Sequence, residues 1–187
     1  MLVRHLLAAV AGLVVFFLPT FPIAQQPNSA VPDSLLREIG KLTPGAVIVG
    51  AEEVDAIACH PLEKSPGLVR ADLNGDGRDD YAVLLKTRET GKETLWEGKK
   101  LREARFAFAL FIDDGKGSYK PRIVRRFTDF VPVAVVLDLQ PAGSVRHRET
   151  RKNIHAPNAA VTLSFCEKSA TTYYMDGGKL RSIPIAD

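Results

Sequence analysis

Ala71-Asp-Leu-Asn-Gly-Asp-Gly-Arg-Asp-Asp-Tyr-Ala-Val-Leu84 is the stretch from which the fold of this chain can be interpreted. In its first part, oxygen ligands can be supplied at every second position, which is typical of a calcium loop. A calcium ion takes roughly six to eight oxygen ligands at about 2.3–2.6 Å. The expected ligands are the side chains of Asp72, Asn74, Asp76 and Asp80 and the main-chain carbonyl of Arg78.

The residues after the loop indicate which kind of calcium loop this is. In an EF-hand, a bidentate Glu occupies the twelfth loop position, between two helices. Here that position is Val83, within the apolar, β-branched and aromatic segment 81–85, which predicts a strand. We therefore expect the acidic turn to join two strands of a β-hairpin.

Residues 71–84 resemble the calcium loop of FG-GAP and VCBS-type repeats, in which an aspartate-rich turn precedes a hydrophobic strand. The resemblance implies a Ca²⁺ ion held by the five ligands named above. Repeats of this family usually assemble into a β-propeller, which a single copy cannot form. The turn at 113–117 resembles the same family more weakly.

An acidic turn without metal is the alternative. Asn-Gly and Asp-Gly are common in hairpin turns that bind no ion. Against this, the crowded acidic and amide groups of residues 72–80 repel one another unless a cation is present. Asp79 is expected to point to solvent or to pair with Arg78.

The N-terminal residues predict export. Arg4 precedes an apolar run at 6–18 and a small residue, Ala24, which is typical of a signal peptide over 1–24. The apolar run is shorter than the roughly 20 residues of a membrane span, although a retained anchor is the alternative. We expect a flexible leader at 25–31, a single domain at 32–187 and an extracytoplasmic location, periplasmic or secreted.

Cys59 and Cys166 are the two cysteines of the chain. An even number of cysteines in an exported protein suggests a disulfide, with two separate buried thiols as the alternative. The formal net charge is +3, and the basic residues are interleaved with acidic or strand-type residues. This distribution gives no indication of nucleic-acid binding.

The remaining pattern predicts a mainly β fold, with α+β as a possibility. A short helix is expected from an Asp33 or Ser34 cap to a stop at Gly40. Strands are expected at 47–49, 68–71, 81–86, 106–112, 119–127, 131–137, 161–166, 171–175 and 180–185. The segments 87–105 and 138–158 are expected to be polar excursions.

Residues 106–112 are apolar at both alternating sets of positions, so this strand should be covered on both faces. The pair Gly177-Gly178 is a strong signal for a two-residue hairpin turn. Together these features predict an antiparallel meander sheet or a sandwich with one short N-terminal helix.

Two functional classes remain open besides calcium binding. Glu52, Glu53 and Asp55, with His60, suggest an envelope hydrolase if the fold brings them together. No phosphate loop, nucleophile elbow or zinc-protease motif occurs in the chain.

The second functional class is a module that binds another molecule. Trp96, in a polar segment, and Tyr173 and Tyr174 could form an exposed aromatic patch, although the tyrosines also suit ordinary strand packing. We expect a non-catalytic, calcium-binding interaction module of the cell envelope, with a protein or glycan as its partner.

Overall fold

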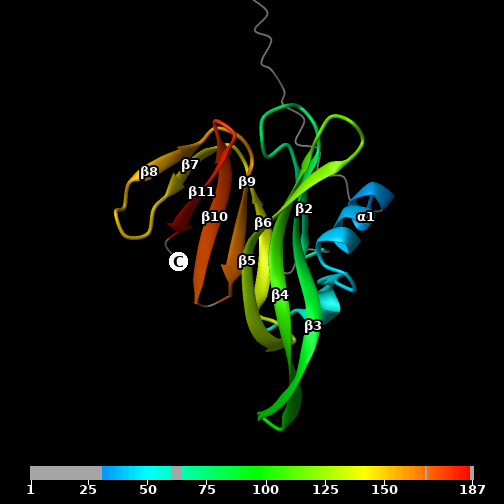
Figure 1. Cartoon of the computed structure of the whole chain (residues 1–187). Helices are drawn as coiled ribbons and strands as arrows, with labels where there is room; N and C mark the ends of the chain where they lie inside the picture. The colour runs from blue at the N-terminus through cyan, green and yellow to red at the C-terminus, as the bar shows by residue number, and fades with distance from the viewer. Residues whose placement is uncertain (1–30, 60–64, 167, 186–187) are drawn as a thin grey trace, which may run out of the picture. The chain divides into compact units, whose positions relative to one another are not determined.

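The computed structural model describes residues 31–59, 65–166 and 168–185 (Figure 1). The predicted signal peptide at 1–24 and residues 25–30 of the predicted leader lie outside this part of the chain. Val31, the last leader residue, packs against a buried apolar cluster of the domain. Among the described residues, no helix is long and apolar enough to cross a membrane.

The described residues form one α-helix, a 3₁₀ turn at Ala51–Glu53 and eleven strands. In chain order the helix and strands are α1 (Asp33–Leu42), β1 (Val47–Ile48), β2 (Leu68–Ala71), β3 (Asp80–Trp96), β4 (Lys99–Asp113), β5 (Tyr119–Val131), β6 (Val135–Gln140), β7 (Gly143–Arg146), β8 (Asn153–Ala156), β9 (Ala160–Phe165), β10 (Ser169–Asp176) and β11 (Lys179–Ile185). The prediction of a mainly β fold with one short N-terminal helix is confirmed.

The strands form two main sheets. The first has the order β1-β3-β4-β5, with β2 also paired to β3, and the second has the order β11-β10-β9-β6. Strands β7 and β8 form a separate hairpin. Every pairing between these strands is antiparallel.

The first sheet is covered on both faces because its central strands alternate between two apolar clusters. One cluster, between the two sheets, contains Leu84 and Phe108 of the first sheet and Leu163 of the second. The other contains Val83 on β3 and Leu35 on α1, so the helix covers the opposite face. The prediction that 106–112 is buried on both faces is confirmed, because β4 is the central strand between these layers.

The helix boundaries differ from the prediction. The N-cap position is occupied by Pro32, in place of the predicted Asp33 or Ser34. Pro32 forms no side-chain capping hydrogen bond. The helix continues through Gly40 to Leu42, although glycine disfavours a helix interior by about 1 kcal/mol. Tertiary packing outweighs this cost, since Ile39 is buried against the sheet and Leu42 packs at the edge of the same cluster.

A disulfide joins Cys59 to Cys166, as predicted, with 5.3 Å between their Cα atoms. The two residues are separated by 107 positions in the chain. The bridge therefore connects the segment before β2 to the residue after β9. On a chain-entropy estimate, closing a loop of this length stabilises the fold by about 4–5 kcal/mol.

The predicted polar excursion at 87–105 is wrong. These residues continue β3 and β4 as one long hairpin, which projects beyond the neighbouring strands in Figure 1. Its turn residues Glu97 and Gly98 both have positive φ, at 47° and 77°, as a type I′ hairpin turn requires. Cross-strand ion pairs such as Lys100–Glu93 make polar residues compatible with a strand ladder.

Two further strand boundaries are corrected. The predicted strand 131–137 is divided, because β5 ends at Val131 and β6 begins at Val135, on either side of Pro132. The second predicted excursion, 138–158, contains the β7–β8 hairpin. The Gly177-Gly178 turn is confirmed, since β10 ends directly before it and β11 begins directly after it.

Candidate functional site at the aspartate-rich turns

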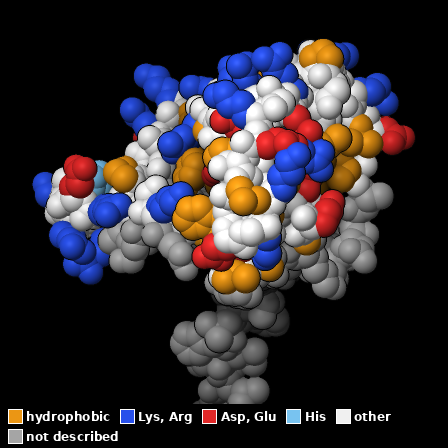
Figure 2. Space-filling view, turned by 90° about the horizontal axis from the view of Figure 1, so that it is seen from below, with side chains coloured by type: hydrophobic (Ala, Val, Ile, Leu, Met, Phe, Trp, Pro, Cys, Tyr) orange, Lys and Arg blue, Asp and Glu red, His pale blue; other side chains and the backbone are white. Residues whose placement is uncertain are grey.

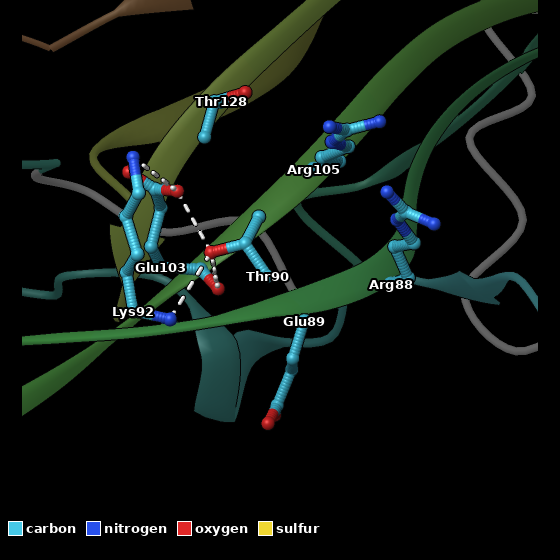
Figure 3. A pocket seen from close by; sticks show the side chains of 7 residues that line it. All are labelled: Arg88, Glu89, Thr90, Lys92, Glu103, Arg105 and Thr128. Atoms are coloured by element: carbon cyan, nitrogen blue, oxygen red, sulfur yellow. Dashed lines mark hydrogen bonds and ion pairs between the residues drawn. The ribbon is translucent and has the colours of Figure 1, made fainter.

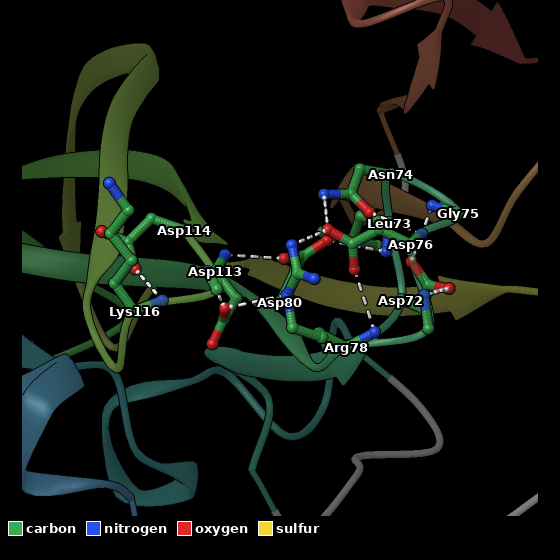
Figure 4. A network of polar contacts seen from close by, with 12 residues as sticks. Asp72, Leu73, Asn74, Gly75, Asp76, Arg78, Asp80, Asp113, Asp114 and Lys116 are labelled. Carbon is green, nitrogen blue, oxygen red and sulfur yellow. Dashed lines mark hydrogen bonds and ion pairs between the residues drawn. The ribbon is translucent and has the colours of Figure 1, made fainter.

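Two aspartate-rich turns meet at one end of the first sheet (Figure 4). The first joins β2 to β3, where Ala71 pairs with Asp80. The second joins β4 to β5, where Asp113 pairs with Tyr119. Because β3 and β4 are neighbours in the sheet, their turns lie side by side.

The carboxylate of Asp72 organises the first turn. One of its oxygens accepts hydrogen bonds from the backbone amides of Gly75 at 2.6 Å and Asp76 at 3.1 Å. The other oxygen accepts from the amide of Gly77 at 2.8 Å. The backbone therefore wraps around Asp72, with Gly75 and Gly77 at φ of 83° and 80°, which glycine adopts without strain.

Asn74, Asp76 and Arg78 form the exposed rim of the turn. The Asn74 amide donates to an Asp76 carboxylate oxygen at 2.8 Å, and the Asp76 backbone amide donates to the Asn74 side chain at 2.9 Å. The Arg78 guanidinium contacts Asp76 and also donates to Asp113 at 3.0 Å. A cationic side chain thus lies between carboxylates of the two turns.

Asp80 connects the two turns, and it is fully buried. One oxygen accepts from the backbone amide of Leu73 at 3.0 Å, and the other accepts from the backbone amide of Asp113 at 2.8 Å. The first bond holds the start of the first turn, and the second holds the start of the second turn. One buried side chain thereby fixes the relative position of both.

Two of the aspartates in the first turn, Asp76 and Asp80, have pKa values shifted in opposite directions. Burial raises the pKa of Asp80, and the nearby charges of Asp76 and Asp72 raise it further, against the lowering effect of its two amide donors. For Asp76, partial desolvation is outweighed by hydrogen bonds from Asn74 and Arg78, so its pKa is lowered. The exposed carboxyl of Asp76 therefore loses its proton more readily than the buried carboxyl of Asp80.

Of the four predicted side-chain ligands, the structure brings Asn74 and Asp76 into contact and directs the other two to different partners. The carboxylates of Asp72 and Asp80 are occupied by backbone amides, and the Arg78 side chain lies on the rim. Among the described residues, no group of three or more His, Cys, Asp or Glu side chains is arranged to hold a metal ion. Asp79 is exposed, as one of its two predicted alternatives required, and it pairs with Arg70 in place of Arg78.

Sequence reasoning missed two neighbours of the first turn. Asp113 lies in the turn at 113–117, and its carboxylate accepts a hydrogen bond from Arg78 of the other turn. The Asn158 side chain lies so close to Gly75 that a Cβ there would approach its Oδ1 atom to 2.6 Å. Only the pairing of distant strands brings these residues together, and no local motif indicates either contact.

The acidic residues proposed for a hydrolase have separate structural partners. Glu53 pairs with Lys86, and its other oxygen accepts from the Gly50 amide at 3.4 Å. Asp55 accepts from the backbone amides of Ile57 and Ala58 in a tight turn. Glu52 is exposed, and His60 lies outside the described residues.

The aromatic candidates for binding separate into two groups. Tyr173 packs against Phe108 with 5.2 Å between ring centroids, which is ordinary core packing, and Tyr174 is partly buried beside it in β10. At the far end of β3, Leu95 and Trp96 are 73% and 65% exposed. Seen from the side toward which this hairpin points, hydrophobic groups are surrounded by charged side chains (Figure 2).

Comparisons with protein families, with curated proteins and with solved structures found no match to this chain. The candidate sites therefore depend on the chemistry of the residues described above.

Proposed function

We propose that this protein is an exported, non-catalytic β module of the cell envelope in which the first aspartate-rich turn binds calcium. The observation that carries the proposal is the concentration of oxygen ligands in residues 72–80, on a backbone already wrapped by Asp72. Carboxylate, amide and carbonyl oxygens are the ligand types that calcium prefers.

The electrostatics of the turn also support a cation there. The rim carboxylate of Asp76 already contacts the positive charge of Arg78, which is shared with Asp113. Arg78 and a calcium ion would therefore compete for Asp76. Bound calcium would supply electrostatic stabilisation of the turn, while Asp72, Asn74, Asp76, Asp80 and the Arg78 carbonyl would hold it.

Calorimetric titration of calcium into the purified protein tests this proposal. We expect a dissociation constant of about 10⁻⁴–10⁻³ M, as in other extracellular modules, and a higher melting temperature in millimolar calcium than in chelator. Asp76→Ala should abolish binding, whereas Arg78→Gln should strengthen it by removing the competing charge. Asp114→Asn, in the other turn, is the matched control and should bind as the parent does.

The proposal would be wrong if the parent takes up no calcium, or if Asp76→Ala and Asp114→Asn bind it equally well. An unchanged melting temperature in chelator and in calcium would also contradict it. These outcomes would leave the acidic turn as a hydrogen-bonded connection stabilised by Arg78.

We further propose that the projecting β3–β4 hairpin is the interaction surface of the module. Leu95 and Trp96 place exposed apolar area at its end, and tryptophan is enriched at binding hot spots. An envelope protein or glycan is the expected partner class. Cross-linking of cells that produce the parent or a Trp96→Ser variant tests this, since the variant should lose the specific adducts if the hairpin end makes the contact.

A further inference from the structure

An open hollow with a volume of about 640 Å³ lies along the outer part of the β3–β4 hairpin and the adjoining strand β5 (Figure 3). It is lined by polar or charged residues, namely Arg88, Glu89, Thr90, Lys92, Glu103, Arg105 and Thr128. The hollow lies away from the aspartate-rich turns, which are at the other end of the β3–β4 pair. A ligand in the hollow would therefore not contact the predicted calcium loop.

Two arginines lie opposite each other in this hollow. Arg88 on β3 is in register with Arg105 on β4, after an irregularity at Thr87 shifts the pairing by one residue. Directly paired residues share a face of the sheet, and like charges in such a pair destabilise it. Figure 3 shows both side chains projecting to the same side of the hairpin.

Among the described residues, no acidic side chain neutralises the positive charge of this pair. Neither guanidinium forms an ion pair or a hydrogen bond with any residue that the structure describes. A third exposed arginine, Arg126, shares the face, because it pairs with Ala107, two residues beyond Arg105 on β4. Thr128 pairs with Arg105 and adds an exposed hydroxyl group.

The acidic residues of the hollow are already engaged with other groups. Glu103 accepts a hydrogen bond from Thr90 at 2.7 Å and lies 3.8 Å from the Lys92 ammonium. Glu89 lies 3.4 Å from Arg102 and points away from the arginine pair in Figure 3. Neither acidic residue of the hollow therefore pairs with Arg88 or Arg105.

We propose that Arg88 and Arg105, with Thr128, bind a phosphate group in this hollow. Guanidinium groups present several donors in a planar arrangement that matches phosphate oxygens. A phosphate group can accept from two guanidiniums and a hydroxyl at once and can carry two negative charges. A carboxylate offers two oxygens and one charge, so it would leave more of the donors unused.

Titration of inorganic phosphate into the intact protein, followed by NMR of the backbone amides, tests this site. We expect saturable shifts around Arg88, Arg105 and Thr128, and weaker binding at higher ionic strength because the groups are exposed. The double variant Arg88→Gln/Arg105→Gln should bind at least about tenfold more weakly, since charge-assisted hydrogen bonds are lost.

Arg122→Gln is the matched control. Arg122 is an exposed arginine on β5, and its pairing with Leu110 places it on the opposite face of the sheet. This variant should retain phosphate binding. Non-saturable shifts in the parent, equal loss in both variants, or unchanged affinity in the double variant would overturn the proposal.

The single variants Arg88→Gln and Arg105→Gln keep the test decisive if the double variant is poorly folded, because each should weaken binding by itself. Sedimentation with phosphatidylglycerol vesicles and with neutral phosphatidylcholine vesicles then identifies the source of the phosphate. Binding to the anionic vesicles that the arginine variants lose indicates a lipid headgroup. Phosphate binding without vesicle binding indicates a soluble phosphate compound.

Discussion

The β3–β4 hairpin has two halves with different properties. Its inner half, 80–86 and 106–113, lies between the helix and the second sheet, and most of its residues are buried. Its outer half, 87–105, is largely exposed and stabilised by cross-strand ion pairs and a tight turn. One continuous pair of strands thus forms the core of the fold in its inner half and an exposed surface in its outer half.

This difference shows that strand pairing and burial are separate requirements. The inner half needs apolar side chains on both faces because two layers cover it. The outer half needs only compatible cross-strand pairs and a turn that matches the strand twist. The same substitution should therefore have very different effects in the two halves.

The largest effect is expected for Phe108→Ala in the inner half. Phe108 is fully buried and packs against Tyr173 of the second sheet. Removing a buried aromatic ring leaves a cavity and typically destabilises by about 3–5 kcal/mol. Chemical denaturation should show this decrease in the free energy of unfolding, and a decrease below about 1 kcal/mol would mean that the two sheets are not tightly packed here.

Asp80→Ala should have the next largest effect. It removes the acceptor of the backbone amides of Leu73 and Asp113, and an unsatisfied buried donor costs about 1–3 kcal/mol. We expect a loss of about 2–4 kcal/mol in calcium-free buffer, measured by denaturation. Asp79→Asn is the control, because it alters only a partly exposed ion pair with Arg70, and such pairs contribute up to about 1 kcal/mol.

Trp96→Ala in the outer half should change stability by less than about 0.5 kcal/mol, although it removes a larger ring than Phe108→Ala does. Trp96 is 65% exposed, so little buried contact is lost. Thermal unfolding of the two alanine variants side by side measures the contrast. A large destabilisation by Trp96→Ala would show that the hairpin end is covered in solution.

The smallest effect concerns pH at the second turn. Backbone hydrogen bonds from Lys116 and Ser118 lower the pKa of Asp114, against a smaller opposing effect of desolvation. Its stabilising contribution is therefore fully present above the unfolded-state pKa of about 3.8 and is lost as the pH falls through the lower folded-state value. Asp114→Asn should remove this contribution. The difference in melting temperature between the parent and the variant should shrink below pH 4, and a constant difference would contradict the assignment.

Several features of the fold were predicted from local patterns. The continuous apolar run at 106–112 indicated a doubly covered strand, and the Gly177-Gly178 pair indicated the last hairpin turn. Both predictions are confirmed, because side-chain alternation and turn conformation depend on neighbouring residues. The Cys59–Cys166 bridge was predicted from the expected compartment and is present.

The predictions that failed depended on contacts between distant segments. Gly40 did not end the helix, because Ile39 and Leu42 pack on the sheet. Residues 87–105 continue the pairing of β3 and β4, with ion pairs such as Lys100–Glu93 across the two strands. For the same reason, the sequence showed a cluster of acidic residues at 72–80 but not the contact between Arg78 and Asp113.

The sequence by itself determined the strand periodicity, the positions of the tight turns and the residue types available as ligands. Only the tertiary structure decided that Asp80 is buried between two turns and that Arg88 and Arg105 lie directly opposite each other on neighbouring strands. The physical reason is range: backbone preferences act over a few residues, whereas burial and charge pairing depend on which strands the folded chain brings together.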